Sequence, residues 1–127
     1  MMAWQTPKTN WNATDSATYM DMNRICGNIN YLLGEERLTK VYTAKDYVYH
    51  PEWLEIVSAF MMVQVAAGIV DPEKPTDGTT SYNFNLIESV CLLAKPIIDY
   101  KRSQENALNY VGEGWRTDSE IYAGGLV

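Results

Sequence analysis

The sequence has few of the residues on which metal and catalytic sites depend. Among its 127 residues there are two cysteines and one histidine, His50. A zinc site needs several Cys, His or carboxylate ligands in a cluster, and the sequence holds none. It also lacks a G-x-G-x-x-G motif and a P-loop, the common nucleotide signatures. We therefore predict no metal and no cofactor, and a capping or packing role for His50, directly before Pro51.

Basic residues are also few. Ten Lys and Arg stand against sixteen Asp and Glu, which gives a net charge of -6. The basic residues are scattered, and Lys101-Arg102 is their only adjacent pair. A surface that follows phosphates needs clustered positive charge, so nucleic acid is not an expected partner.

No hydrophobic run is long enough to span a membrane. The longest, Ile56 to Val70, is interrupted by Gln64 and falls short of the roughly 20 residues required. It predicts the central helix of a small bundle. Gln64 is interpreted as a buried, hydrogen-bonded amide in preference to the alternative, in which it marks the exposed line of the helix. The N-terminus has no signal-peptide pattern, and Cys26 and Cys91 lie in apolar helical patterns. We expect buried, reduced thiols, no membrane contact and a bacterial cytoplasm or a virion as the location.

Aromatic residues with a polar tip are plentiful, since four Trp and nine Tyr stand against two Phe. Trp4 and Trp11 precede the first helical pattern, and Pro7 is the only rigid residue between them. Disordered tails seldom carry such apolar mass, so residues 1–13 are predicted to be an extended arm that docks. Its docking site could be the protein's own core or another subunit, and both alternatives stay open at this point.

Apolar spacing predicts a mainly α, three-helix bundle-like protein, a single domain over residues 1–127. The helical core covers residues 14–108. The first helix is predicted from about Ser16 to Leu33, with Asn12 or Asp15 as its N-cap. Gly34 is expected to end it, and Gly27 to admit a close neighbour.

The second helix is predicted to start at His50-Pro51 and to reach about Ile69. The third is predicted to start at a capping box, Asn85-Leu-Ile-Glu88, and to be kinked at Pro96. Glycine-spaced aromatics then predict a short C-terminal β segment or hairpin over residues 109–127.

Polar residues give two further signals. Asp21, Asn23, Arg24 and Asn28 lie on the first helix and are expected to fix it through polar contacts. Glu52 and Glu55, three residues apart on the second helix, are interpreted as a solvated edge. An enzyme would need a deep pocket lined by Glu88 or Asp99 with a shifted pKa, and this is the least favoured class.

The pattern Trp4-x-Thr-Pro-Lys-Thr-x-Trp11, followed by Asp21-x-Asn-Arg-Ile25 and Asn28-Ile-x-Tyr-Leu32, resembles a known N-terminal pattern. It is found in small structural proteins from tail and baseplate regions of Firmicutes phages and prophages. The ending Ile121-Tyr-Ala-Gly124 is similar to endings in the same group. The resemblance implies a virion or assembly component and carries over no catalytic residues.

The first functional hypothesis is therefore a non-enzymatic phage or prophage structural or assembly protein that docks on neighbouring subunits through its terminal segments. Its partners would be other phage structural proteins or further copies of itself, and we expect a homo-oligomer. The alternative is a cytoplasmic adaptor or regulatory protein that binds a protein partner through the apolar surface of the second helix. The interface residues predicted for the first hypothesis are Trp4, Pro7, Trp11, Asp21, Asn23, Arg24, Asn28, Trp115 and Tyr122.

Overall fold

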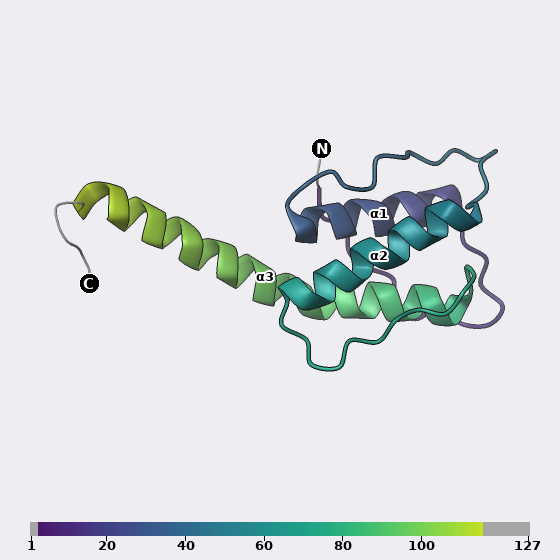
Figure 1. Ribbon diagram of the computed structural model, residues 1–127. Helices are drawn as coiled ribbons and strands as arrows, with labels where there is room; N and C mark the ends of the chain where they lie inside the picture. The colour runs from purple at the N-terminus through teal and green to yellow at the C-terminus, as the bar shows by residue number, and fades with distance from the viewer. Residues whose placement is uncertain (1–2, 116–127) are drawn as a thin grey trace. The chain divides into compact units, whose positions relative to one another are not determined.

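The computed structural model describes the backbone of residues 3–115 and the side chains of residues 3–105. Over this part the chain forms three helices and no strand: α1 (Tyr19–Leu33), α2 (His50–Ala66) and α3 (Ser81–Trp115) (Figure 1). The helices pack together, which confirms the prediction of a mainly α fold built on three helices.

The chain divides into two compact units within α3. The first, Met1–Pro96, holds α1, α2 and the beginning of α3. The second starts at Ile97, and its described part is the remainder of α3. α3 continues through Pro96 without a break, so the proline does not divide the helix.

α1 starts later than its predicted N-cap. Thr18 is the N-cap, and it forms a capping box with Asp21, whose backbone N–H donates to the Thr18 hydroxyl. The prediction of Asn12 or Asp15 was wrong because these two residues close a separate turn, in which Asp15 accepts from the Asn12 N–H at 2.9 Å. Gly34 ends α1 with a φ of 73°, as predicted.

Gly27 faces the arm, but at an ordinary distance. A Cβ built at this position would lie 3.9 Å from the carbonyl oxygen of Ala3. This is normal van der Waals separation, so packing does not require glycine here, contrary to the expectation of a close approach.

α2 begins at His50-Pro51 as predicted and ends at Ala66, three residues before the predicted end. One side of the helix is buried against α1 and α3, and Trp53 packs edge-on against Phe84 of α3 with ring centroids 6.1 Å apart. The fully buried side chains of this side include Ile56, Ala59, Phe60 and Val63.

Both ends of α3 differ from the prediction. The helix begins at Ser81, where the Thr80 hydroxyl accepts from the N–H of Asn83 at 3.2 Å. Asn85 and Glu88 therefore lie inside the helix, and the predicted capping box was wrong.

The prediction of a C-terminal β segment was also wrong over residues 109–115, because these residues are helical. Continued helical hydrogen bonding outweighs the cost of each glycine in a helix, which is roughly 1 kcal/mol. Residues 116–127 lie outside the described part.

Candidate protein-interaction site

The N-terminal arm lies on its own chain. From residue 3 to residue 18 it forms neither helix nor strand, yet Pro7 and Trp11 are buried. In Figure 1 the arm (purple) passes behind α1 and α3, whereas α2 lies in front of them. Hydrogen bonds join the arm to Asn28 of α1 and Glu88 of α3. Of the two predicted docking sites, the protein's own core and another subunit, the structure shows the first.

Asn28 of α1 holds the first part of the arm through its side-chain amide. Its Oδ1 accepts from the backbone N–H of Gln5 and its Nδ2 donates to the Gln5 carbonyl, both at 2.8 Å. One buried side chain thus pairs with the main chain as a neighbouring strand would. Trp4 packs against Tyr31 in a tilted arrangement with ring centroids 5.6 Å apart, and the Lys95 ammonium lies 5.4 Å from the centroid of each ring.

Glu88 of α3 holds the second part of the arm. Its carboxylate is buried, with the side chain 1% exposed. Oε1 accepts from the Lys8 N–H at 3.0 Å and from Arg24 Nε at 2.7 Å. Oε2 accepts from Trp11 Nε1 at 2.6 Å and from Arg24 Nη2 at 2.8 Å. Four donors from the arm and α1 therefore converge on one buried carboxylate, the pattern in which a buried charge is stabilised.

Arg24 links this carboxylate to the start of α1. Its Nη2 also lies 2.9 Å from Oδ1 of Asp21. The hydrogen bonds to Glu88 raise the pKa of Arg24 against the opposing effect of burial. Burial alone would raise the pKa of Asp21, but hydrogen bonds from Thr18 and Arg24 outweigh it and hold that pKa below its ordinary value.

Asn23 and Asn30 of α1 hold the loop after Gly34. Asn23 exchanges hydrogen bonds with the backbone N–H and carbonyl of Tyr42, at 2.8 and 3.0 Å. Asn30 does the same with Leu38, at 2.9 Å for each. Asn23, Asn28 and Asn30 of α1 thus each pair with the main chain of a segment that is neither helix nor strand.

Glu52 is not a simple solvated edge. It accepts from Lys40 Nζ at 2.8 Å, from the Tyr42 hydroxyl at 3.3 Å and from the Tyr49 N–H at 3.2 Å. The Lys40 hydrogen bond lowers the pKa of Glu52, and burial together with nearby negative charge raises that of Tyr42. This cluster fastens the loop to the start of α2, whereas Glu55 is exposed.

Most of the predicted interface residues have partners within the chain. Six of them belong to the network that joins the arm and the loop to the helices, and Pro7 is buried beside it; the six are Trp4, Trp11, Asp21, Asn23, Arg24 and Asn28. The side chain of Trp115 and the whole of Tyr122 lie outside the described part. A role for these nine residues in contacts with other proteins stays a prediction.

Sequence reasoning named Glu88, the central residue of this network, only as a helix cap or a possible enzyme carboxylate and missed its role in holding the arm. A usable signal exists, because Glu88 shares one helical face with the buried residues Phe84, Ile87 and Cys91. A carboxylate in the middle of an apolar stripe needs a buried partner. Its partners lie far away in the sequence, and the Trp11 side chain is separated from it by 77 positions.

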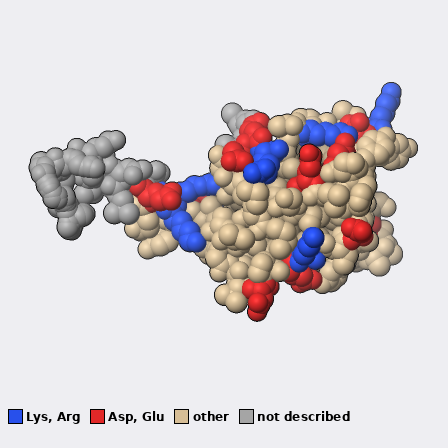
Figure 2. All heavy atoms as spheres, in the orientation of Figure 1, with Lys and Arg blue, Asp and Glu red and all other residues tan. Residues whose placement is uncertain are grey.

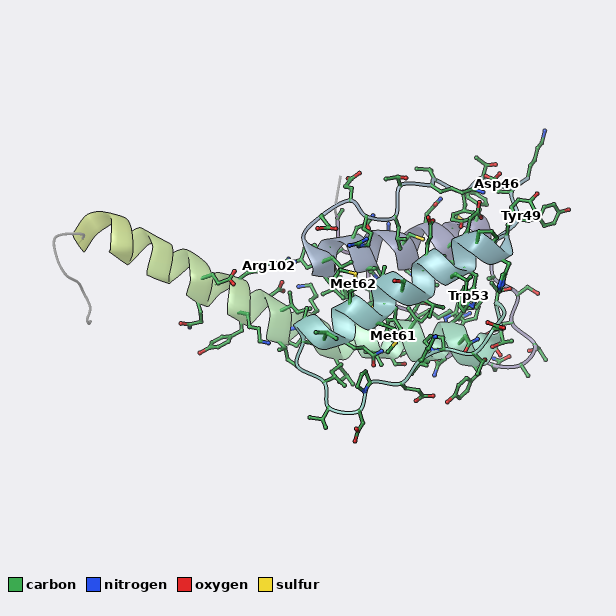
Figure 3. The ribbon with its side chains drawn as sticks, in the orientation of Figure 1. Asp46, Tyr49, Trp53, Met61, Met62 and Arg102 are labelled. Atoms are coloured by element: carbon green, nitrogen blue, oxygen red, sulfur yellow. The ribbon has the colours of Figure 1, made fainter. Side chains whose placement is uncertain are left out.

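The outer side of α2 is an apolar surface open to solvent. Leu54, Met62 and Val65 are 47%, 39% and 72% exposed. A groove of about 480 Å³ opens where α2 ends beside the end of α1, and it is lined by Leu33, Ser58, Met61, Met62, Val65 and Ala66. Figure 2 shows no charged side chain over the second half of α2, and Figure 3 labels Met61 and Met62 on this part of the helix. We call Leu54, Ser58, Met61, Met62 and Val65 the outer face of α2.

The buried polar and thiol groups near this helix serve packing. Gln64 is 1% exposed and its Nε2 donates to the Glu73 carbonyl at 2.9 Å, which confirms a buried, hydrogen-bonded amide. Cys26 and Cys91 are buried and unpaired with each other, as predicted. Burial raises the pKa of Cys26 to about 12 and raises that of Cys91 as well, so neither thiol is an activated nucleophile.

Within residues 3–105 no three His, Cys, Asp or Glu side chains are grouped so that they could hold a metal ion. None of the helices in the described part is both long and apolar enough to cross a membrane. Protein-family models, curated proteins and solved structures gave no match to this chain.

Proposed function

We propose that this chain is a non-enzymatic structural or assembly protein whose function is contact with other protein subunits, of the phage tail and baseplate kind that its N-terminal pattern resembles. The observation that carries the proposal is the outer face of α2. Leu54 is about half exposed and Val65 largely exposed on this face, and no charged residue lies between Ile56 and Val70. Contiguous exposed apolar surface of this kind is typical of protein-interaction sites.

The arm supports the proposal indirectly. Its tryptophans are engaged by α1 and α3, so they form part of the folded unit and, among the residues that the structure describes, leave the outer face of α2 uncovered. Met61 and Met62 suit such a surface, because the unbranched thioether side chain adapts its shape to a partner. The same face would serve a cytoplasmic adaptor, and the resemblance of the N-terminal pattern favours the phage protein.

Mass spectrometry of purified phage particles tests the proposal. A virion component gives peptides of this chain in a fixed ratio to known tail proteins. An assembly factor is absent from finished particles, but particle yield falls when Val65→Glu replaces the wild-type gene. Val41→Glu is the matched control, since Val41 is 75% exposed on the loop and receives the same charge. A chain absent from particles, with normal yield in both variants, would refute the phage proposal and leave the adaptor.

A further inference from the structure

We propose that the outer face of α2 binds the same face of a second copy, with the two helices antiparallel about a two-fold axis. This inference rests on the proposed function, because it names one subunit that the face contacts. It starts from an imbalance within α2. The helix is apolar almost all round, as a helix enclosed on every side would be, yet within residues 3–105 only the side toward α1 and α3 is covered.

The spacing of the outer face suits a helical partner. Leu54, Ser58, Met61 and Val65 follow one another at intervals of four, three and four residues. This is the alternation that places side chains along one seam between packed helices. Leu54, Ser58 and Val65 are exposed and Met61 is half-buried, so the seam is available in the folded chain.

In an antiparallel arrangement the seam of one copy is complementary to the same seam of the other copy. When Leu54 of one copy lies opposite Val65 of the other, Ser58 lies opposite Met61, twice by symmetry. The small serine then provides the space that a long methionine fills. A two-fold interface needs such self-complementarity, since the same patch must serve as both partners.

Charge favours the second copy and the antiparallel direction. Each chain carries a net charge of -6, so most faces would bring like charges together. The middle of the outer face carries none, because Ile56 to Val70 has no charged residue. A parallel pair would place Glu52 and Glu55 beside their own copies, whereas the antiparallel pair separates them to opposite ends.

Sedimentation equilibrium of the full chain tests the inference, over concentrations from about 1 to about 100 µM. We expect a dimer at the upper end, and Val65→Glu should weaken self-association at least about tenfold by placing a charge in the apolar contact. Val41→Glu should dimerise as the wild type does. A wild-type chain that stays monomeric, or a Val65→Glu chain that dimerises normally, overturns the inference.

Cysteine cross-linking tests the direction. In the antiparallel arrangement Leu54→Cys mixed with Val65→Cys forms a disulfide-linked pair. Each single variant alone does not, because identical positions lie about 16 Å apart along the axis, at 1.5 Å per residue. Linkage of each single variant to itself, without the mixed pair, would overturn the antiparallel arrangement.

These results separate the inference from the proposed function. If the chain is monomeric but Val65→Glu still lowers particle yield, the face binds another protein and only the inference fails. If the chain dimerises through α2 but neither enters particles nor affects their yield, the inference holds and the phage proposal fails.

Discussion

Glu88→Gln tests whether one buried carboxylate holds the arm on the helices. The side chain keeps its size, while its charge and one of its two acceptor oxygens are lost. Oε1 and Oε2 each accept two hydrogen bonds in the folded chain, from Lys8 and Arg24 and from Trp11 and Arg24. Whichever way the new amide is turned, two of the four donors face an NH₂ group instead of an acceptor.

The magnitude follows from this count. A hydrogen bond to a charged group contributes about 1.5–3 kcal/mol, so two lost bonds cost about 3–6 kcal/mol. The Arg24 guanidinium, with its side chain 16% exposed, keeps only Asp21 as a counter-charge. Removing one partner of a buried ion pair costs about 3–5 kcal/mol in comparable cases. We therefore expect the free energy of unfolding to fall by about 3–5 kcal/mol.

Urea denaturation followed by circular dichroism measures this loss. Limited proteolysis with trypsin locates it, because the bond after Lys8 lies in the arm and the Lys8 N–H is bound to Glu88 in the folded chain. Glu88→Gln should speed cleavage after Lys8. Glu55→Gln makes the same chemical change on an exposed side chain, and should stay within about 0.5 kcal/mol of the wild type.

A double-mutant cycle assigns the loss to the arm. Trp11→Phe keeps a ring beside Phe84 but removes the donor to Glu88 together with part of the buried indole; the lost volume costs the same in both backgrounds, so the cycle isolates the hydrogen bond. If the carboxylate holds the arm, Trp11→Phe should cost much less in the Glu88→Gln background than in the wild type. A Glu88→Gln variant as stable as Glu55→Gln, with an unchanged cleavage rate after Lys8, would refute the reasoning.

Three further outcomes are expected. Gly27→Ala should stabilise the protein by about 0.5–1 kcal/mol in urea denaturation, because a Cβ there meets only the Ala3 oxygen at 3.9 Å; a loss would show that the arm needs the glycine. The pKa of Asp21 is lower in the folded chain than in the unfolded chain. The ionised Asp21 carboxylate therefore stabilises the fold fully at a pH above its unfolded-state pKa, and this stabilisation is lost as the pH falls through its folded-state pKa. Asp21→Asn should therefore lose less stability than the wild type from about pH 5 to about pH 2, and an unchanged pH profile would contradict this. Cys26 and Cys91 should react with a disulfide reagent at about pH 8 only as fast as the chain opens, and rapid labelling of folded protein would contradict their burial.

The helices were predictable because apolar spacing is a local property. Met22, Ile25, Ile29 and Leu32 recur on one face of α1, and all are buried. Gly34 and Pro51 mark helix ends through their own backbone preferences, and both predictions were confirmed. Where several residues could have been the N-cap of a helix, the local capping preferences selected the wrong one. Thr18 was passed over in favour of Asn12 and Asp15, and the letters Asn-x-x-Glu occur by coincidence inside α3.

The sequence predicted that the arm docks, but it did not predict which residues the arm docks on. Two tryptophans before the first helix indicate a need for burial, and that need is local information. The residue that meets Trp11 is 77 positions away, and no periodicity in either segment connects them. Asn28 is similar, since an asparagine on a polar helix edge does not reveal that it pairs with the main chain of Gln5.

The apolar run from Ile56 to Val70 was interpreted as a helix at the centre of a bundle, and the structure shows why that interpretation is incomplete. A helix enclosed on every side needs neighbours on every side, and the described chain supplies α1 and the first part of α3 on one side only. The arm could have covered the other side, but Asn28 and Glu88 hold it on α1 and α3. The 72% exposure of Val65, on the same outer face as Met61 and Met62, is therefore unexplained by the described part of the chain. A second copy of the same face is the partner that this imbalance, the spacing of the seam and the absence of charge together favour.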